Sequence, residues 1–324
     1  MKNAEKYHAN GDIVNAEIRY REAIKVGCLV DRLFINLGVI CRNTGRAEEA
    51  ILLYKKAMKI NPKNPNAYTN LGNLYQSLGN FEGAVAYSSM SLELKPNNPK
   101  ALITLGWSQK MLGNLDQALA STLKSLELQP DNPTAHMNLG GIYKDLGNLD
   151  QALSSTLKSL ELKPDNPSAY TNLGSIYQDL GDLDQALASN LQSLKLKPDN
   201  PSAHMNLGSI YQDLGSIDEA LACTLKSLEL KPDNPSAYMN LGMTYETMNE
   251  LHSALESYTE SANMIMKHKD ESSLISLISA SMILLQMNRV EDAKEALSNA
   301  LTIAHNEKIV LKPSSIKNKK YNKF

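Results

Sequence analysis

Apolar and small residues recur along this chain at the spacing of α-helices. Within residues 65–98, one such run has its members one helical turn apart, at Tyr68, Leu71, Gly72 and Tyr75. Because this i, i+3, i+4, i+7 spacing is that of a single helical face, the run predicts a helix. A second run predicts another helix over about residues 81–94. Together they predict a pair of packed helices.

Residues that begin and end helices flank both runs. Asn64 is a favoured N-cap residue, and Pro65 after it suits the first helical position. Gly79 stands where the first helix would end, because glycine adopts the left-handed conformation at little cost. Pro96 stops the second helix, since proline cannot donate a helical hydrogen bond. Residues 65–98 therefore read as one helix-turn-helix unit.

The same pattern returns every 34 residues along most of the chain. Its clearest marker is Asn-Leu-Gly followed by Tyr and Gly, which starts at Asn70, Asn138, Asn172 and Asn206. Self-similarity at a period of this size indicates stacked supersecondary units. Positions within a repeat are called places below, with Pro65 and its counterparts at place 1. A glycine recurs at place 8 and an alanine at place 20, where we expect the two helices of a hairpin to cross closely.

These places carry a family resemblance. In residues 167–200 the characteristic residues are Tyr170, Leu173, Gly174, Tyr177, Gly181, Ala186 and Pro198. The chain resembles tetratricopeptide-repeat (TPR) proteins. The resemblance implies an all-α fold, a right-handed superhelical α-solenoid of about nine helix-turn-helix repeats. It also implies a role in protein binding, because this family binds many unrelated partners.

The predicted domain organisation is a TPR solenoid over residues 1–304 and a basic, disordered tail over residues 305–324. The repeats are expected near 1–30, 31–64, 65–98, 99–132, 133–166, 167–200, 201–234 and 235–268, with a degenerate copy over 274–304. Near the C-terminal end, Asn249 replaces the turn glycine, and Asn288 marks the degenerate copy. The tail holds six lysines and one acid from Asn306 onward. It has two interpretations, a solubilising end or a contact with an anionic surface such as RNA or lipid.

The resemblance implies that places 2, 5, 6, 9, 12 and 13 face the concave side of the solenoid. Place 6 holds an asparagine in most copies: Asn36, Asn70, Asn138, Asn172, Asn206 and Asn240. An asparagine amide offers an acceptor and two donors, so such a row can hold the backbone of an extended peptide. The row is similar to the one in the TPR region of O-linked N-acetylglucosamine transferase. The alternative is that these asparagines hydrogen-bond neighbouring repeats to one another.

Other candidate groove residues are one tryptophan and several charged side chains. Trp107 lies at place 9 and Lys110 at place 12 of the copy that has Thr104 in place of asparagine. Tryptophan is enriched at binding hot spots, but packing in the interior is the alternative. Place 13 is acidic in three copies, at Asp145, Asp179 and Asp213. These carboxylates either line a mildly acidic groove or sit at solvated helix ends.

The sequence contains no motif that indicates a catalytic site. The net charge of −2 is no argument for nucleic acid, and the three cysteines form no CxxC pair. His136 and His204 stand at place 4, where other copies have tyrosine, so we expect them to fill the same packing slot. Some TPR proteins grip chaperone carboxylate tails with lysines at places 2 and 5 and an arginine at place 6. Here place 5 holds no lysine and place 6 no arginine, so this clamp is not present. We therefore expect a protein that is not an enzyme and has no cofactor and no metal site.

The predicted function is a non-enzymatic scaffold that binds an extended peptide or partner segment in its groove. The alternative is a substrate-recruiting subunit, or a shortened relative, of a TPR-containing glycosyltransferase or other transferase. A third role is membrane-associated assembly through the basic tail. The N-terminal residues lack an apolar signal segment, and the longest uncharged stretch, 272–288, is shorter than the ~20 residues of a membrane span. A cytoplasmic location, protein partners and no membrane span are expected.

Overall fold

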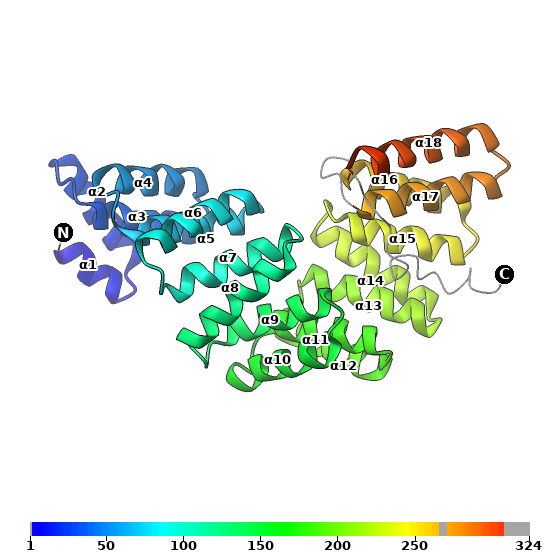
Figure 1. Ribbon diagram of the computed structural model, residues 1–324, viewed down its shortest axis with the longest axis horizontal. Coiled ribbons are helices and arrows are strands. Elements are labelled where there is room, and N and C mark those ends of the chain that lie inside the picture. The colour runs from blue at the N-terminus through cyan, green and yellow to red at the C-terminus, as the bar shows by residue number, and fades with distance from the viewer. Residues whose placement is uncertain (1, 266–270, 308–324) are drawn as a thin grey trace. The chain divides into compact units, whose positions relative to one another are not determined.

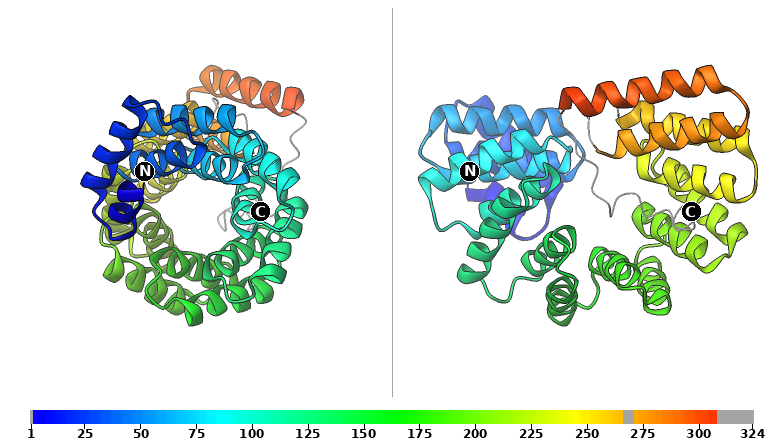
Figure 2. Two further views of the ribbon diagram at one scale, coloured as in Figure 1. Left: turned by 90° about the vertical axis from the view of Figure 1, so that its left-hand side faces the viewer. Right: turned by 45° about the vertical axis from the view of Figure 1, so that its right-hand side comes forward.

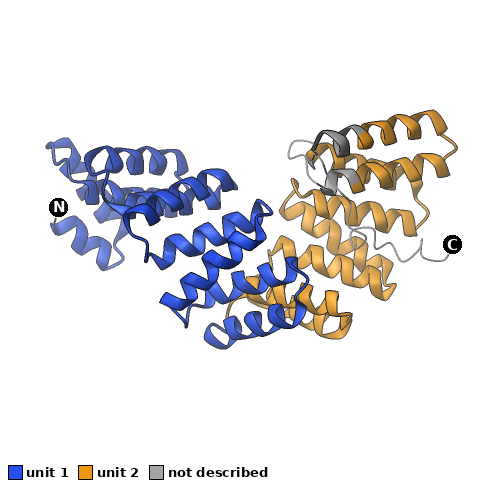
Figure 3. Cartoon of the chain, in the orientation of Figure 1, with its two compact units in different colours: residues 1–164 blue, residues 165–324 orange. Residues whose placement is uncertain are grey.

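The computed structural model of the protein is built from α-helices (Figure 1). It describes residues 2–265 and 271–307, and these contain eighteen helices and no strand. Contacts between its residues divide the chain into two compact units, unit 1 over residues 1–164 and unit 2 over residues 165–324 (Figure 3). The helices of unit 1 are α1 Lys2–Ala9, α2 Ile13–Lys25, α3 Asp31–Asn43, α4 Ala47–Ile60, α5 Pro65–Ser77, α6 Phe81–Leu94, α7 Pro99–Met111, α8 Leu115–Leu128, α9 Pro133–Asp145 and α10 Leu149–Leu162. Those of unit 2 are α11 Pro167–Leu180, α12 Leu183–Leu196, α13 Pro201–Leu214, α14 Ile217–Leu230, α15 Pro235–Thr247, α16 Leu251–Ile265, α17 Glu271–Gln286 and α18 Val290–Glu307.

Within each unit the helices pack as consecutive hairpins. Each odd-numbered helix packs against the even-numbered helix that follows it, as the views of Figure 2 show. Consecutive first helices also touch one another, α3 to α5 to α7 to α9 in unit 1 and α11 to α13 to α15 in unit 2. The first helices therefore form one layer of each unit and the second helices form the other. The predicted all-α solenoid of helix-turn-helix repeats is confirmed.

The small residues at place 8 sit at the crossing of the two helices in a hairpin. A Cβ on Gly72 would lie 2.7 Å from the Ser88 hydroxyl and 3.4 Å from the Ala84 carbonyl oxygen. A Cβ on Gly106 would likewise meet the Thr122 hydroxyl and lie 3.1 Å from the carbonyl of Ala118. The expected close approach is confirmed, and the nearest obstacle is the side chain at place 24.

The turn inside each hairpin needs a left-handed residue. Gly79 has a φ of +75°, as the sequence predicts. Two turns of unit 2 use asparagine instead, at Asn249 with φ +62° and Asn288 with φ +60°. Asparagine is the non-glycine residue that visits this region most readily, because its short polar side chain bonds locally. The two departures from the repeat pattern therefore keep the same turn.

The C-terminal hairpin is longer than the degenerate copy expected from the sequence. α17 covers most of the uncharged stretch 272–288, and α18 continues to Glu307, through the first residues assigned to the tail. Residues 308–324, which carry the tail lysines, lie outside the described residues, so the predictions for them stay predictions. No helix among residues 2–265 and 271–307 is both long and apolar enough to span a membrane.

Candidate functional site

The side of each unit that carries places 2, 5, 6, 9, 12 and 13 of the first helices is called here the first-helix face. Its residues at places 12 and 13 meet across neighbouring hairpins. In unit 1, Lys110 Nζ lies 2.7 Å from Asp145 Oδ2, which joins α7 to α9. In unit 2, Gln178 Nε2 donates to Asp213 Oδ2 at 2.9 Å, which joins α11 to α13. Places 12 and 13, which the resemblance assigned to a groove, thus meet across neighbouring first helices in each unit.

Trp107, Lys110 and Asp145 form a cluster on this face in unit 1. The Lys110 ammonium lies 5.3 Å from the centroid of the Trp107 ring, within the range of a cation–π contact. Lys110 has a side chain only 14% exposed, whereas 36% of the Asp145 side chain is exposed. Trp107 is half-buried, so its ring packs on one side and stays accessible in part. Trp107, Lys110 and Asp145, which the sequence analysis named as separate candidate groove residues, are therefore neighbours.

Several asparagines at place 6 donate hydrogen bonds to the preceding hairpin. Asn36 Nδ2 donates to the Tyr20 hydroxyl at 3.0 Å. Asn206 Nδ2 lies 3.3 Å from both the Thr171 carbonyl oxygen and Asn190 Oδ1. These bonds match the inter-repeat interpretation of the asparagine row. They use the amide N–H groups and leave the Oδ1 acceptors of Asn36 and Asn206 without a bond among the described residues.

The remaining members of the row fall into two kinds. Asn240 Nδ2 donates to the Met205 carbonyl at 3.4 Å, and half-buried Asn172 is also engaged in an interaction. Asn70 is half-buried and Asn138 is only 3% exposed. Neither side-chain amide of these last two is hydrogen-bonded to a described residue. Both free amides belong to unit 1, on α5 and α9.

The copy without the asparagine also links its neighbours. Thr104 replaces asparagine at place 6 of α7, and its hydroxyl bonds to Asn73 Oδ1 on α5. The polar side chain at this place thus connects first helices even where its type changes. Among the acidic residues at place 13, Asp179 is exposed and engaged in an interaction.

The two histidines at place 4 have a structural partner. His136 Nε2 lies 2.8 Å from the Pro130 carbonyl oxygen, and His204 Nε2 lies 3.0 Å from that of Pro198. The Tyr68 hydroxyl donates to the equivalent carbonyl of Pro62 at 3.1 Å. Tyrosine and histidine therefore have one role, to fix the connection between hairpins. No group of three or more His, Cys, Asp or Glu within the described parts of the chain is placed to hold a metal ion.

The residues at place 24 are the ones that sequence reasoning missed. Those of helices α4 to α16 face the place-8 glycine of their own hairpin. Two place-24 residues, Asn190 and Tyr20 of the first hairpin, accept from the next asparagine of the row. The Tyr54 hydroxyl is buried without a hydrogen-bond partner among the described residues, and burial raises the pKa of Tyr54 to about 12. A recurring polar or tyrosine residue sixteen places after the glycine was the available signal.

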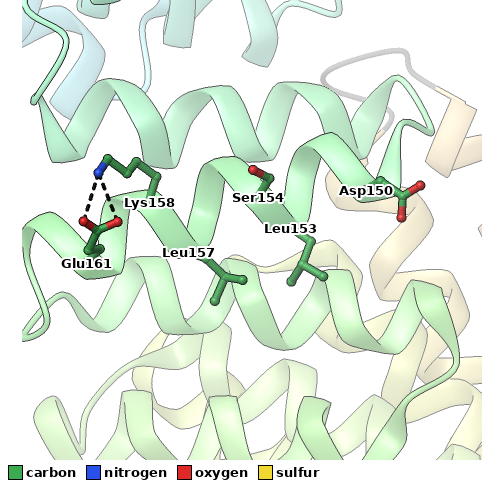
Figure 4. A pocket seen from close by; sticks show the side chains of 6 residues that line it. All are labelled: Asp150, Leu153, Ser154, Leu157, Lys158 and Glu161. Atoms are coloured by element: carbon green, nitrogen blue, oxygen red, sulfur yellow. Dashed lines mark hydrogen bonds and ion pairs between the residues drawn. The ribbon is translucent and has the colours of Figure 1, made fainter.

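The opposite layer offers a weaker candidate. A shallow hollow runs along α10, lined by Asp150, Leu153, Ser154, Leu157, Lys158 and Glu161 (Figure 4). Lys158 pairs with Glu161 at 3.0 Å on the same helix, and Leu157 is 45% exposed. Asp150 stands in the first turn of α10, where a carboxylate suits the helix dipole. Lining residues from a single helix do not converge on a common centre as catalytic or ligand-binding groups do.

Solved structures confirm the fold. A chain of the crystal structure of the APC/C hetero-tetramer Cut9-Hcn1 is 17% identical, with a TM-score of 0.66, and the match covers 92% of this chain and 55% of that one. This chain therefore spans about half the length of that protein. A tetratricopeptide repeat protein from Parabacteroides merdae ATCC 43184 is 22% identical, with a TM-score of 0.62 over 75% of this chain and 96% of that one. Pseudomonas aeruginosa pilF is 19% identical, with a TM-score of 0.52 over 64% and 94%.

Family models agree with this similarity. A model of the TPR repeat matches residues 38–79, 140–181, 174–215 and 208–249, and models of the tetratricopeptide repeat match residues 65–98 and 235–264. These matches cover more than half of the sequence, and none of them singles out O-linked N-acetylglucosamine transferase. No curated protein matches the chain with significance. The chain belongs to the tetratricopeptide-repeat family, whose members generally mediate protein–protein interactions.

Proposed function

We propose that this protein is a non-enzymatic interaction scaffold that holds an extended segment of a partner protein along its first-helix face. The observation that carries the proposal is the pair of free amides in the asparagine row of unit 1. Asn138 is buried, and neither it nor Asn70 has a hydrogen-bond partner among the described residues. A side-chain amide without a protein partner keeps its acceptor and both donors for an incoming peptide.

An extended peptide suits these amides chemically. Each peptide unit presents one N–H and one C=O, and one asparagine amide can bond to both. Contacts to the backbone make little demand on the partner's sequence, so side chains beside the row would supply selectivity. Asn206 and Asn240 already donate to the preceding hairpin. In this proposal they stabilise unit 2 and contribute at most an acceptor oxygen to a partner.

The alternative of a transferase-recruiting subunit would use the same face. Its bound segment would be a substrate of a separate enzyme, and no arrangement among the described residues favours it over a free-standing scaffold. The proposal therefore stays with peptide binding itself.

The test uses peptides selected against the full chain from a random-sequence display library. The double variant Asn70→Ala, Asn138→Ala is expected to bind the selected peptides about tenfold or more weakly, while its melting temperature stays nearly constant. Asn206→Ala combined with Asn240→Ala is expected to lower the free energy of unfolding by about 1 kcal/mol and to change the affinity less. Calorimetric titration and thermal melts measure the two effects.

Asn148→Ala is the matched control, because Asn148 is exposed before α10 and makes no side-chain capping bond. A library that yields no binding peptide contradicts the proposed function. Equal weakening by the control and by the Asn70/Asn138 double variant contradicts the assigned residues.

A further inference from the structure

The first-helix faces of the two units carry opposite charge. Places 2 and 12 of the first helices α3, α5, α7 and α9 in unit 1 hold five basic residues: Arg32, Arg42, Lys100, Lys110 and Lys144. The acid among places 2, 5, 6, 9, 12 and 13 of these four helices is Asp145. On α11, α13 and α15 of unit 2, the same six places contain no lysine or arginine and hold Asp179, Asp213 and Glu246.

Part of the positive charge in unit 1 is uncompensated. Lys110 pairs with Asp145, and Arg32 pairs with Glu5 at 2.9 Å. Lys100 is exposed at the start of α7 and has no ion pair with a described residue. The Arg42 guanidinium donates to the neutral Asn43 amide at 3.2 and 3.3 Å. Two cations of this face are therefore available to an incoming carboxylate.

An apolar anchor lies on the same helix as Lys100. Lys100, Trp107 and Met111 follow one another on α7 at intervals of seven and four residues, so they share one side of that helix. Trp107 is half-buried and Met111 is 45% exposed. The Lys110 ammonium lies 5.3 Å from the centroid of the Trp107 ring. Aromatic and methionine side chains of this kind are the ones enriched at interface centres.

We propose that the first-helix face of unit 1 binds an acidic peptide segment that also carries an apolar side chain. The apolar side chain packs on Trp107 and Met111, and the carboxylates meet Lys100 and Arg42. The asparagines of α5 and α9 hold the peptide backbone on either side of α7. This inference rests on the proposed function and adds the chemical class of the partner segment.

Trp107 is the only tryptophan of the chain, so its fluorescence reports on this face directly. The probes are a short synthetic peptide of Asp, Glu and Leu, a counterpart with Lys at every acidic position, and an uncharged counterpart with Ser there. The acidic peptide is expected to shift or quench the emission of Trp107 and to bind about tenfold or more tighter than the lysine peptide. Its affinity should fall as salt is added, because the contacts are exposed charges.

Variants locate the contact. Lys100→Gln and Arg42→Gln should each weaken the acidic peptide about two- to fivefold, the range of exposed ion pairs. Lys124→Gln is the matched control, since Lys124 is exposed on α8 in the opposite layer. Trp107→Phe, followed by calorimetry, should weaken the acidic peptide while leaving the melting temperature nearly unchanged.

The outcomes separate this inference from the proposed function. Equal affinity for the three peptides, or equal effects of Lys100→Gln and Lys124→Gln, overturns the acidic class and its site. Peptide binding as such would then still stand on the display-selected peptides. Failure of all three synthetic peptides to bind, while display-selected peptides do bind, overturns the inference alone.

Discussion

Unit 1 and unit 2 are built from the same hairpin but differ on the face that their first helices present. In both units a place-8 glycine faces a place-24 side chain, Gly140 against Thr156 and Gly174 against Asn190. The exposed places of the first helices differ, with Trp107 and several bases in unit 1 and serines, amides and acids in unit 2.

The links between neighbouring hairpins differ as well. In unit 1 several are ion pairs, such as Arg46 with Glu17 at 2.6 Å and Arg21 with Glu49 at 2.6 Å. In unit 2 the links between hairpins that involve described residues are hydrogen bonds rather than ion pairs, among them Asn200 Nδ2 to the Thr171 hydroxyl at 3.0 Å and Gln178 Nε2 to Asp213 Oδ2 at 2.9 Å. The two units therefore share the residues that pack inside each hairpin and differ in the residues at the outer places of the first helices.

The shared interior gives the largest expected effect. A Cβ on Gly140 would collide with the Thr156 hydroxyl and lie 3.1 Å from the Ala152 carbonyl oxygen. A Cβ on Gly174 would lie 2.8 Å from Asn190 Cγ and 3.1 Å from the Ala186 carbonyl oxygen. We expect Gly140→Ala and Gly174→Ala each to lower the free energy of unfolding by about 1–3 kcal/mol, as overpacked helix contacts do. Urea denaturation followed by circular dichroism measures the loss.

A second substitution tests whether the interiors are really equivalent. Thr156→Ala should restore part of the stability of Gly140→Ala, because Thr156 has no hydrogen-bond partner to lose among the described residues. Asn190→Ala should restore less in Gly174→Ala, since Asn190 also accepts from Asn206. Ser154→Ala, on the exposed side of α10, is the control. A Gly140→Ala protein as stable as this control would show that the crossing is not tight.

The hairpins themselves were predictable from the sequence. The second helix expected at residues 81–94 is α6, Phe81–Leu94, because its boundaries are set by local residues. The N-cap role of Asn64 is of the same kind, since its side chain accepts from the Asn66 N–H at 3.0 Å. Such signals act over a few residues, so one sequence is enough to read them.

The candidate site was predictable only in part. The asparagine row and Trp107 could be placed on the first helices, but the bonding of each asparagine could not. Asn206 and Asn70 occupy the same place, yet one bonds to Asn190 and the other is free. That difference depends on the place-24 side chain and its rotamer in the preceding hairpin. Periodicity gives the place of a residue, whereas the contact depends on packing between repeats.

The ion pairs of unit 1 predict a difference in acid sensitivity. Hydrogen bonds and charge from Arg46, and then from Arg21, lower the pKa of Glu17 from 4.5 to about 2. A carboxylate whose pKa is depressed by folding stabilises the fold fully above its unfolded value, and this stabilisation is lost as pH falls from about 4.5 to about 2. Because the arginines are partly exposed, we expect the contribution to be only about 1 kcal/mol.

Glu17→Gln tests this difference. The variant should be less stable at neutral pH by about that amount, and its stability should fall less steeply over the acidic window. Trp107 fluorescence follows unit 1, and hydrogen exchange of amides in α11 to α15 follows unit 2. Glu22→Gln is the control, because Glu22 pairs only within α2 and is half exposed. Equal acid sensitivity of the two units in the wild-type protein would contradict the comparison of their links.

The smallest expected effect concerns the turns. The described turns of unit 1 hairpins use glycine, whereas unit 2 uses Asn249 between α15 and α16. Asn249 makes the same backbone bonds as Gly215, with its N–H 3.1 Å from the Glu246 carbonyl and the next N–H 2.9 Å from that of Tyr245. The backbone hydrogen bonds of the turn are therefore already made, and what remains is the cost of placing a residue with a side chain in the left-handed conformation.

Asn249→Gly should raise the stability of unit 2 by a few tenths of a kcal/mol. Asn249→Ala should lower it by about 1 kcal/mol, since alanine lacks the local bonding that lets asparagine adopt a positive φ. Hydrogen exchange at the amide of Glu250, which closes this turn, measures both changes, and Gly215→Asn provides the reciprocal exchange. If Asn249→Ala proved as stable as Asn249→Gly, the positive φ would not limit the turn, and its glycines would have to be explained by something other than backbone conformation.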